Sequence, residues 1–445
     1  MPDNPHIVIL GAGVCGLYAA RSLTSKGCKV TVLEKEEKVG GLATSERRGS
    51  NYYDLGVHML HEHDREIYED CVGVMGEESI PVELRARIRW AGSFYRYPLQ
   101  FGDMVRGMPP ITLGQCVFGL FVAQLRNKIA PWEPTNCEEA LIQLYGRPLY
   151  QFFFEDFTHR YWGRHPAEIS ATFVKRKMPR LTAVDAIKKM LSAIGIKEKP
   201  GRTVESALLE ETLHYSRTGA ESMPRCLARQ IEEDGGTIVT GCTPEAVHAR
   251  AGKVQSVTLR RAGSKRSETL DADAVISTIP VVDLVGALRP KAPDPVRESC
   301  RELRWLPIVI YGLLVRKEKT MDALYTYYRE RVFHRVGEPK NAGLVVDPPD
   351  HTVLIVEMTC QVGDAKWEGA ESVKKQLFAD LETEGLCTEE DVVEINILRN
   401  AHGYPVFALG YEPHHERVVD YLESLDNLLS VGRQGGFTFP NMHTA

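Results

Sequence analysis

Three glycines near the N-terminus have the spacing that lets a backbone approach a pyrophosphate group. Residues 11–16 read G-x-G-x-x-G, with glycine at positions 11, 13 and 16. Gly11 permits a tight turn, Gly13 lets a pyrophosphate come close to the main chain, and Gly16 allows a helix to pack against a strand. A helix that starts at this loop points free N–H groups and the positive end of its dipole at the phosphates. The spacing therefore indicates a phosphate-binding loop.

Two apolar runs and a helical pattern surround this loop. Ile7–Leu10 and Val30–Leu33 are short apolar runs typical of buried parallel strands, and Leu17–Leu23 between them has a helical period. The second run is followed by Glu34, where an acidic side chain can accept hydrogen bonds from an adenosine ribose. Strand, loop, helix, strand and acid in this order predict a dinucleotide-binding β-α-β unit.

A second glycine pair follows the acid at Gly40 and Gly41. This arrangement resembles the extended fingerprint of the FAD-binding, amine-oxidase-like flavoenzymes, in which the second loop wraps the pyrophosphate and ribityl chain. The resemblance implies FAD as the cofactor and an α/β fold with a Rossmann-like FAD-binding domain of the GR2 type. The cofactor-binding residues expected in this first segment are Gly11, Gly13, Val14, Cys15, Gly16, Glu34, Lys35, Gly40, Gly41, Leu42 and Ala43. The Cys15 thiol has no expected chemical role.

Length and composition limit the class of protein. A chain of 445 residues predicts two or three domains. A net charge of −6 argues against a nucleic-acid partner, and ten scattered cysteines without metal-binding spacing favour reduced thiols in a cytoplasmic protein. No signal peptide is visible. The most apolar stretch, Cys116–Ala123, is too short to span a bilayer and predicts a buried helix, with a membrane-surface helix as the alternative.

The pattern changes along the chain suggest an FAD domain assembled from three segments. These are residues 1–100, 206–295 and 401–445. Residues 101–205 lose strand character, and the amphipathic runs Ala140–Tyr145 and Val184–Leu191 predict a helical insert on the substrate side, with Ile196–Arg202 as a linker. Residues 296–400, with the apolar runs Ile308–Val315 and Thr352–Met358, predict an antiparallel-sheet substrate domain.

The segment Tyr52–His58 resembles the corresponding segment of the UDP-galactopyranose mutase branch of these flavoenzymes. The resemblance implies that His58 lies beside the isoalloxazine ring and that Arg176 is an arginine near the flavin. His61 and His63 follow His58, but their spacing suits neither one helix face nor a zinc finger, so no metal site is expected.

Three further residues match the mutase branch. Tyr325 and Arg335 lie ten residues apart, and Tyr404 lies in the sequence His402-Gly403-Tyr404-Pro405. The resemblance implies that these side chains grip the diphosphate of a nucleotide sugar. Arginine suits that role because its planar fork donates paired, charge-assisted hydrogen bonds to phosphate.

The C-terminal segment resembles the last FAD motif of the same group. The resemblance implies that Gly432 and Arg433 lie near the flavin, that Val247 lies against the adenine, and that Phe439 completes the cofactor contacts. The mutases have a tyrosine at the position of Phe439 and an aspartate at that of His443, and a phenyl ring cannot donate a hydrogen bond to phosphate. In this respect the tail also resembles the protoporphyrinogen-oxidase-like enzymes.

Two reactions stay open at this point. The enzyme is either a mutase-like isomerase that uses N5 of reduced flavin on a nucleotide sugar, or an oxidase or dehydrogenase that removes hydride from a small molecule. Each implies a small-molecule substrate, and membrane association is not expected.

Overall fold

The computed structural model describes residues 4–62, 64–97, 99–177 and 212–442. The predicted helix Val184–Leu191 and the predicted linker Ile196–Arg202 lie outside these residues, as do His63 and His443.

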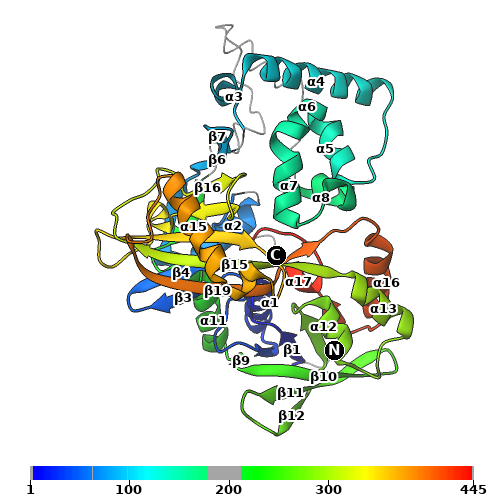
Figure 1. Ribbon diagram of the computed structural model, residues 1–445. Coiled ribbons are helices and arrows are strands. Elements are labelled where there is room, and N and C mark those ends of the chain that lie inside the picture. Colours follow the sequence, from blue (N-terminus) through cyan, green and yellow to red (C-terminus); the bar gives the residue numbers. More distant parts are fainter. Residues whose placement is uncertain (1–3, 63, 98, 178–211, 443–445) are drawn as a thin grey trace.

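A five-stranded parallel sheet carries the predicted β-α-β unit (Figure 1). Its central strand is apolar and buried from Ile7 to Leu10, as expected where both faces are covered. Ile7 pairs with Val30 on one side and with Ala274 on the other, so segments far apart in the chain meet at this strand. In spatial order the strands are β20 (Leu428–Ser430), β13 (Ala274–Ser277), β1 (His6–Leu10), β2 (Lys29–Leu33) and β9 (Thr237–Val239).

Helices cover this sheet. Helix α1 (Val14–Thr24) contains the predicted helical run Leu17–Leu23 and begins earlier, directly after Gly13. It packs against α11 (Ser222–Glu233), which in turn contacts α2 (Arg65–Met75). On another side, α12 (Val281–Ala287), α13 (Asp294–Glu302) and α16 (Glu412–Glu423) contact one another in sequence, and the short α17 (Gly432–Gly435) follows β20.

A four-stranded sheet lies next to the parallel sheet and is made of β12 (Ser267–Asp271), β11 (Lys253–Arg261), β10 (Cys242–Arg250) and β14 (Leu288–Arg289). Two antiparallel strand pairs lie in this half: the hairpin β3 (Ser45–Arg48) with β4 (Asn51–Asp54), and the long-range pair β5 (Ser79–Glu83) with β8 (Thr212–Ser216).

The predicted substrate sheet has seven strands. Their order is β19 (Val392–Val406), β15 (Arg304–Val315), β18 (Thr352–Thr359), β17 (Arg335–Gly337), β16 (Tyr325–Tyr328), β6 (Ala86–Trp90) and β7 (Ser93–Tyr97). Helices α14 (Ala365–Glu368) and α15 (Glu371–Thr383) accompany this sheet. The antiparallel pairing was predicted from the apolar runs, and it holds for every pair except β6 with β16, which are parallel.

The pair β6–β7 comes from a part of the chain that the sequence assigned to the first FAD segment. Ala91 and Gly92, both at positive φ, form the tight turn between these strands. The resulting hairpin then adds to the open edge of β16, a long-range pairing that local patterns do not reveal. The domain boundaries themselves stay a prediction.

A group of helices forms the insert, at the top of Figure 1: α3 (Phe101–Gly107), α4 (Pro110–Ile129), α5 (Cys137–Tyr145), α6 (Arg147–Leu149), α7 (Glu155–Trp162) and α8 (Ala171–Lys177). The prediction that residues 116–123 form a buried helix is only half right. Cys116 and Leu120 are buried, but Phe118, Phe121 and Val122 are largely exposed, because α4 packs on α5 and α6 with one face only. In the described part of the chain, every helix is too short or too polar to cross a membrane.

Candidate functional site

The first glycine loop has a geometry that larger residues cannot adopt. Gly11 has φ of +96°, and its N–H donates a 2.8 Å hydrogen bond to the carbonyl of Leu33. A Cβ atom added to Gly16 would lie 2.1 Å from the carbonyl oxygen of Gly11. Both positions therefore require glycine, and the main chain at the start of α1 stays uncovered by side chains of these residues.

The second glycine pair lies directly against the first loop. Gly40 donates its N–H to the carbonyl of Ala12 at 2.8 Å, and Gly13 and Gly40 form an isolated parallel bridge. A Cβ atom on Gly41 would lie 3.1 Å from the Cα of Gly13. The two glycine segments form one continuous backbone surface, and Leu42 and the buried Ala43 follow on from it.

Glu34 is the buried acid at the end of β2. Its Oε2 accepts the N–H of Ala12 at 2.7 Å and its Oε1 accepts the N–H of Glu36 at 3.0 Å. These bonds fix the carboxylate beside the glycine loop with lone pairs to spare for ribose hydroxyls. The next residue, Lys35, has a side chain that is 65% exposed and lies 3.7 Å from Glu36.

The strand that carries Val247 starts beside this acid. In β10 the N–H of Cys242 donates to the carbonyl of Glu34 at 2.8 Å, and Val247, further along, is fully buried between β11 and β14. The end of β2 and the start of β10 are thus joined at the site predicted for the adenosine.

The C-terminal motif docks on the phosphate loop. Gly432 has φ of +79°, and a Cβ atom there would lie 2.9 Å from the sulfur of Cys15. The Cys15 side chain therefore packs against the C-terminal turn. Burial raises the pKa of the Cys15 thiol to about 11, so the group stays protonated and serves as a spacer between two segments.

Arg433 is a half-buried cation that forms no ion pair with a carboxylate among the described residues. Its Nη2 donates to the carbonyl of Pro440 at 2.7 Å, and its guanidinium lies 5.5 Å from the ring centre of Tyr404 and 5.4 Å from that of Phe439. Burial lowers the pKa of Arg433, and the nearby hydroxyls of Tyr404 and Tyr161 partly offset this effect. The side chain presents positive charge to the space between the C-terminal turn and the seven-stranded sheet.

His58 lies near this charge, after the strand β4 and the turn at Gly56. Its Nδ1 is 3.3 Å from the carbonyl of Gly56. Burial, together with the charges of Arg433 and Arg335, lowers the pKa of His58 to about 4. The imidazole is therefore neutral at physiological pH.

Arg335 forms a two-pronged ion pair with Glu357, a residue that sequence reasoning missed. The Nε and Nη2 atoms of Arg335 each donate to one carboxylate oxygen at 2.7 Å, and Val57 donates its N–H to the same carboxylate at 3.2 Å. Burial by itself would raise the pKa of Glu357, but the charge of Arg335 and contact with His334 outweigh it and lower the pKa to about 2. Because β17 and β18 pair Arg335 with Glu357 directly, this contact comes from sheet register.

Aromatic rings enclose the Arg335 side chain. Tyr325 and Tyr327 project from the same face of β16, and the guanidinium lies 5.6 Å from each ring centre. Tyr327 stands directly opposite Arg335 in the ladder and its hydroxyl is 3.5 Å from Nη1. The predicted pair Tyr325–Arg335 is brought together, and the alternating Tyr-Thr-Tyr pattern could also have revealed Tyr327.

Helix α7 of the insert closes the other side. Tyr161 lies 5.8 Å from Tyr404, whose ring meets Phe439 edge-on at 4.9 Å, and Trp162 is 6.3 Å from Phe439. Burial raises the pKa of Tyr161 and of Tyr327, so both hydroxyls remain protonated donors. Sequence reasoning missed Tyr161 and Trp162 because nothing local distinguishes them from core aromatics. Arg176 lies in α8, and its side chain is outside the described residues.

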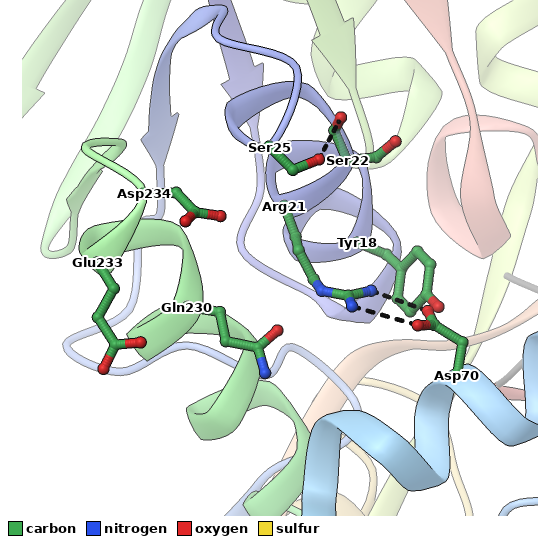
Figure 2. Close-up of a pocket in the computed structure, with 8 residues that line it drawn as sticks. All are labelled: Tyr18, Arg21, Ser22, Ser25, Asp70, Gln230, Glu233 and Asp234. Carbon is green, nitrogen blue, oxygen red and sulfur yellow. Dashed lines mark hydrogen bonds and ion pairs between the residues drawn. The ribbon is translucent and has the colours of Figure 1, made fainter.

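A cavity of about 430 Å³ lies elsewhere in the molecule. Figure 2 shows it on the outer side of α1, where Arg21 forms two hydrogen bonds with Asp70 at 2.8 and 3.2 Å. None of the predicted site residues lines this cavity, and its arginine is already neutralised. We therefore place the candidate site at the convergence of the glycine loops, Arg433 and the seven-stranded sheet.

These residues fit a dinucleotide flavin. The glycine surface and the start of α1 suit a pyrophosphate, the Glu34 carboxylate suits a ribose, and the unpaired cation Arg433 suits an electron-rich ring system. A Cβ atom added to Gly13 would meet only the Cα of Gly41 among the described residues, at 4.0 Å, so the main chain is open at this position.

Comparison with known proteins agrees with this geometry. A family model described as flavin containing amine oxidoreductase matches residues 14–330. A probable UDP-galactopyranose mutase of Klebsiella pneumoniae is 26% identical over 178 residues, which are 39% of this chain and 45% of that relative. A dTDP-fucopyranose mutase of Escherichia coli is 23% identical over 233 residues, 48% of this chain and 61% of that relative. The matches thus span less than two thirds of either mutase.

Solved structures share the fold. A reduced UDP-galactopyranose mutase superposes with a TM-score of 0.79 at 20% identity, covering 97% of this chain and 90% of the other. A structure from Exiguobacterium sp. 255-15 named as a protoporphyrinogen oxidase gives 0.70 at 17% identity, covering 100% and 97%. With more than two thirds of its length inside the family match, and with a site shaped for the cofactor, this chain belongs to the flavin-containing amine oxidoreductases and is an FAD-dependent enzyme distantly related to sugar mutases.

Proposed function

We propose that this enzyme acts on a nucleotide-sugar substrate as a mutase-like isomerase, with its diphosphate held between the seven-stranded sheet and helix α7. The observation that carries the proposal is the convergence of Arg335, Tyr325 and Tyr404, three residues from three separate strands, next to Arg433. When bound and reduced, FAD supplies a nucleophilic N5 for chemistry at the sugar.

The charge of the pocket supports a diphosphate. Arg335 and Arg433 are two cations, Glu357 is one anion, and His58 is neutral, so these groups sum to one positive charge. Glu357 occupies two of the donors of Arg335 and leaves Nη1 as the donor directed at Tyr327. Arg335 would therefore contact phosphate through one edge, with its orientation fixed by Glu357.

Tyrosine hydroxyls can replace the one that this chain lacks at position 439. Phe439 packs on Tyr404 and beneath Arg433, where it excludes water but donates no hydrogen bond. Tyr327 and Tyr161 stay protonated and face the same space. We propose that they donate hydrogen bonds to the diphosphate alongside Tyr325 and Tyr404. We further propose that His58 lies beside the flavin as a neutral donor or acceptor. Arg176 of α8 is proposed as an arginine near the flavin.

The cofactor contacts follow the same proposal. The two glycine loops, with Val14 and Cys15, would bind the pyrophosphate, and Glu34 with the Lys35 backbone would bind the ribose. Val247 would meet the adenine, while Gly432 and Arg433 would meet the flavin.

The alternative reaction is hydride removal by oxidised FAD. Two observations favour it: the family match itself, and the apolar lining that Phe439 and Trp162 give the pocket. The two reactions make opposite demands on the redox state of the flavin, and this difference allows a direct test.

The test is titration of the holoenzyme with UDP and UDP-sugars, before and after anaerobic reduction with dithionite, while the flavin spectrum is recorded. Binding that shifts the spectrum, and that is lost in Arg335→Ala, supports the nucleotide-sugar proposal. Absence of binding in both redox states excludes it. Bleaching of the flavin by a substrate without added reductant would instead establish the oxidase reaction.

Two further variants separate binding from folding. Arg335→Ala leaves Glu357 buried without its partner, so the double variant Arg335→Met with Glu357→Gln removes both charges together. Arg331→Ala is the matched control. Arg331 lies in the loop between β16 and β17, and its ion pair with Glu384 does not involve the tyrosines of the candidate site. We expect the double variant to keep FAD and lose UDP binding, and the control to keep both.

A further inference from the structure

Helix α4 has two faces of similar apolar character, and other elements of the described chain cover only one of them. Cys116 and Leu120 are buried, and Gly119 fits closely against Pro148 of α6, where an added Cβ would lie 2.6 Å from the proline ring. Asn127 fixes the far end of the helix by donating to the carbonyl of Gln143 in α5 at 2.7 Å. The helix is therefore held rigidly by its inner face.

The outer face is a straight apolar stripe. Its side chains recur three or four residues apart, the spacing of one helix face, and are 44% to 79% exposed to solvent. They are Ile111, Phe118, Phe121, Val122, Leu125 and Ile129. We call these six residues the α4 stripe. A helix of 20 residues is about 30 Å long, so the stripe runs along a full edge of the insert, at the end of the molecule far from the parallel sheet (Figure 1).

Helix α4 itself carries charges of one sign, and the acidic residues that flank this segment, Asp103 and Glu133, are paired with Arg96 and Lys175. The sequence from Met104 to Trp132 contains Arg106, Arg126 and Lys128 and no aspartate or glutamate, in a chain whose net charge is −6. At about 100° per residue, Arg126 and Lys128 lie roughly 80° to either side of the centre of the stripe. Both are exposed, and Arg126 lies 5.4 Å from the ring centre of Trp132.

We propose that the α4 stripe is a membrane-surface site, and that this helix lies in the headgroup region of a bilayer containing anionic lipid. Phenylalanine, leucine and isoleucine would enter the acyl boundary, while Arg126 and Lys128 extend from both flanks to the lipid phosphates. Trp132 stands at the end of the helix, where amphipathic rings favour the interface.

The charge pattern selects this occupant over a second copy of the chain. In a two-fold symmetric contact, the same surface faces itself, so the basic residues of one α4 would meet a partner helix that also lacks acidic residues. An anionic lipid surface supplies the missing negative charge. The inference is independent of the reaction proposed above.

The test is flotation of the holoenzyme with phosphatidylcholine vesicles, with and without phosphatidylglycerol. We expect binding to the anionic vesicles that weakens with added salt, and weak binding to neutral ones. Phe118→Ser with Leu125→Ser should reduce binding at least about tenfold. Arg126→Gln with Lys128→Gln should reduce it roughly 30-fold at low salt, from about 1 kcal/mol for each basic residue near the surface.

A matched control removes two exposed apolar side chains elsewhere. Val362→Ser with Val393→Ser changes residues that are 61% and 50% exposed and should leave vesicle binding unchanged, and flavin content reports folding for all variants. Failure of the wild-type protein to bind anionic vesicles overturns the proposal. An equal loss of vesicle binding in the control variant also overturns it. A third contrary result is a wild-type dimer that binds no vesicles and that dissociates when Phe118 and Leu125 are changed to serine.

Discussion

Replacement of Glu357 by glutamine tests the buried pair that fixes Arg335. Glu357 is 1% exposed, and its pKa of about 2 lies roughly 2.5 units below its ordinary value of 4.5. At about 1.4 kcal/mol for each tenfold change in acidity, the pair favours the charged, folded state by about 3–4 kcal/mol. Removing one partner of a buried ion pair costs about 3–5 kcal/mol, which agrees with this magnitude.

The expected shift in melting temperature follows from the size of the chain. An unfolding entropy of about 2.1 cal/mol/K per residue gives ~0.9 kcal/mol/K for 445 residues. Glu357→Gln should therefore lower the melting temperature at pH 7 by roughly 4 °C. The assay is thermal unfolding followed by tryptophan fluorescence at a fixed excess of FAD, because bound cofactor also stabilises the fold.

The pH dependence gives a second signature. Because the folded-state pKa is depressed, the contribution of Glu357 is complete above about pH 4.5 and is lost as the pH falls towards 2. The gap in melting temperature between wild type and variant should close across that window. Glu390→Gln, a change at an exposed site, should match wild type throughout. A variant melting within about 1 °C of wild type at pH 7, or a gap that stays constant with pH, would refute the reasoning.

Two other predictions concern the cofactor loop and the histidine. Gly16→Ala places a Cβ atom 2.1 Å from the carbonyl oxygen of Gly11 and should abolish flavin binding, measured as flavin absorbance per chain. The control variant Gly73→Ala changes a glycine in α2 that has open space around it and should retain flavin. The ring of His58, observed by NMR with labelled histidine and assigned by its loss in His58→Gln, should titrate with a midpoint near 4, since burial and two guanidinium groups oppose its protonation. A midpoint near 6.5 would contradict that environment. The contribution of the neutral His58 ring to the stability of the folded state should be complete above pH 6.5 and should fall as the pH drops towards 4.

The sequence alone determined the cofactor half of this protein. The glycine spacing, the flanking apolar runs and Glu34 are all features of one continuous segment, so their local order was enough to predict β1, α1 and β2 and their turn. The apolar runs of the seven-stranded sheet were equally local, and β15 and β18 form where they were expected. Patterns of this kind predict secondary structure without tertiary information, because they reflect the backbone conformation of one continuous segment.

Only the tertiary structure decided the partners. Strand register placed Glu357 opposite Arg335, and the packing of α17 placed Gly432 against Cys15. No local sequence pattern predicts either of these contacts. Tyr161 entered the pocket because the insert folds back over the sheet. The two faces of α4 illustrate the same limit: periodicity defines an apolar face, but only the packed structure determines whether another element of the described chain covers it. Side-chain contacts between distant segments depend on how whole elements pack, and that is not encoded in any short window of sequence.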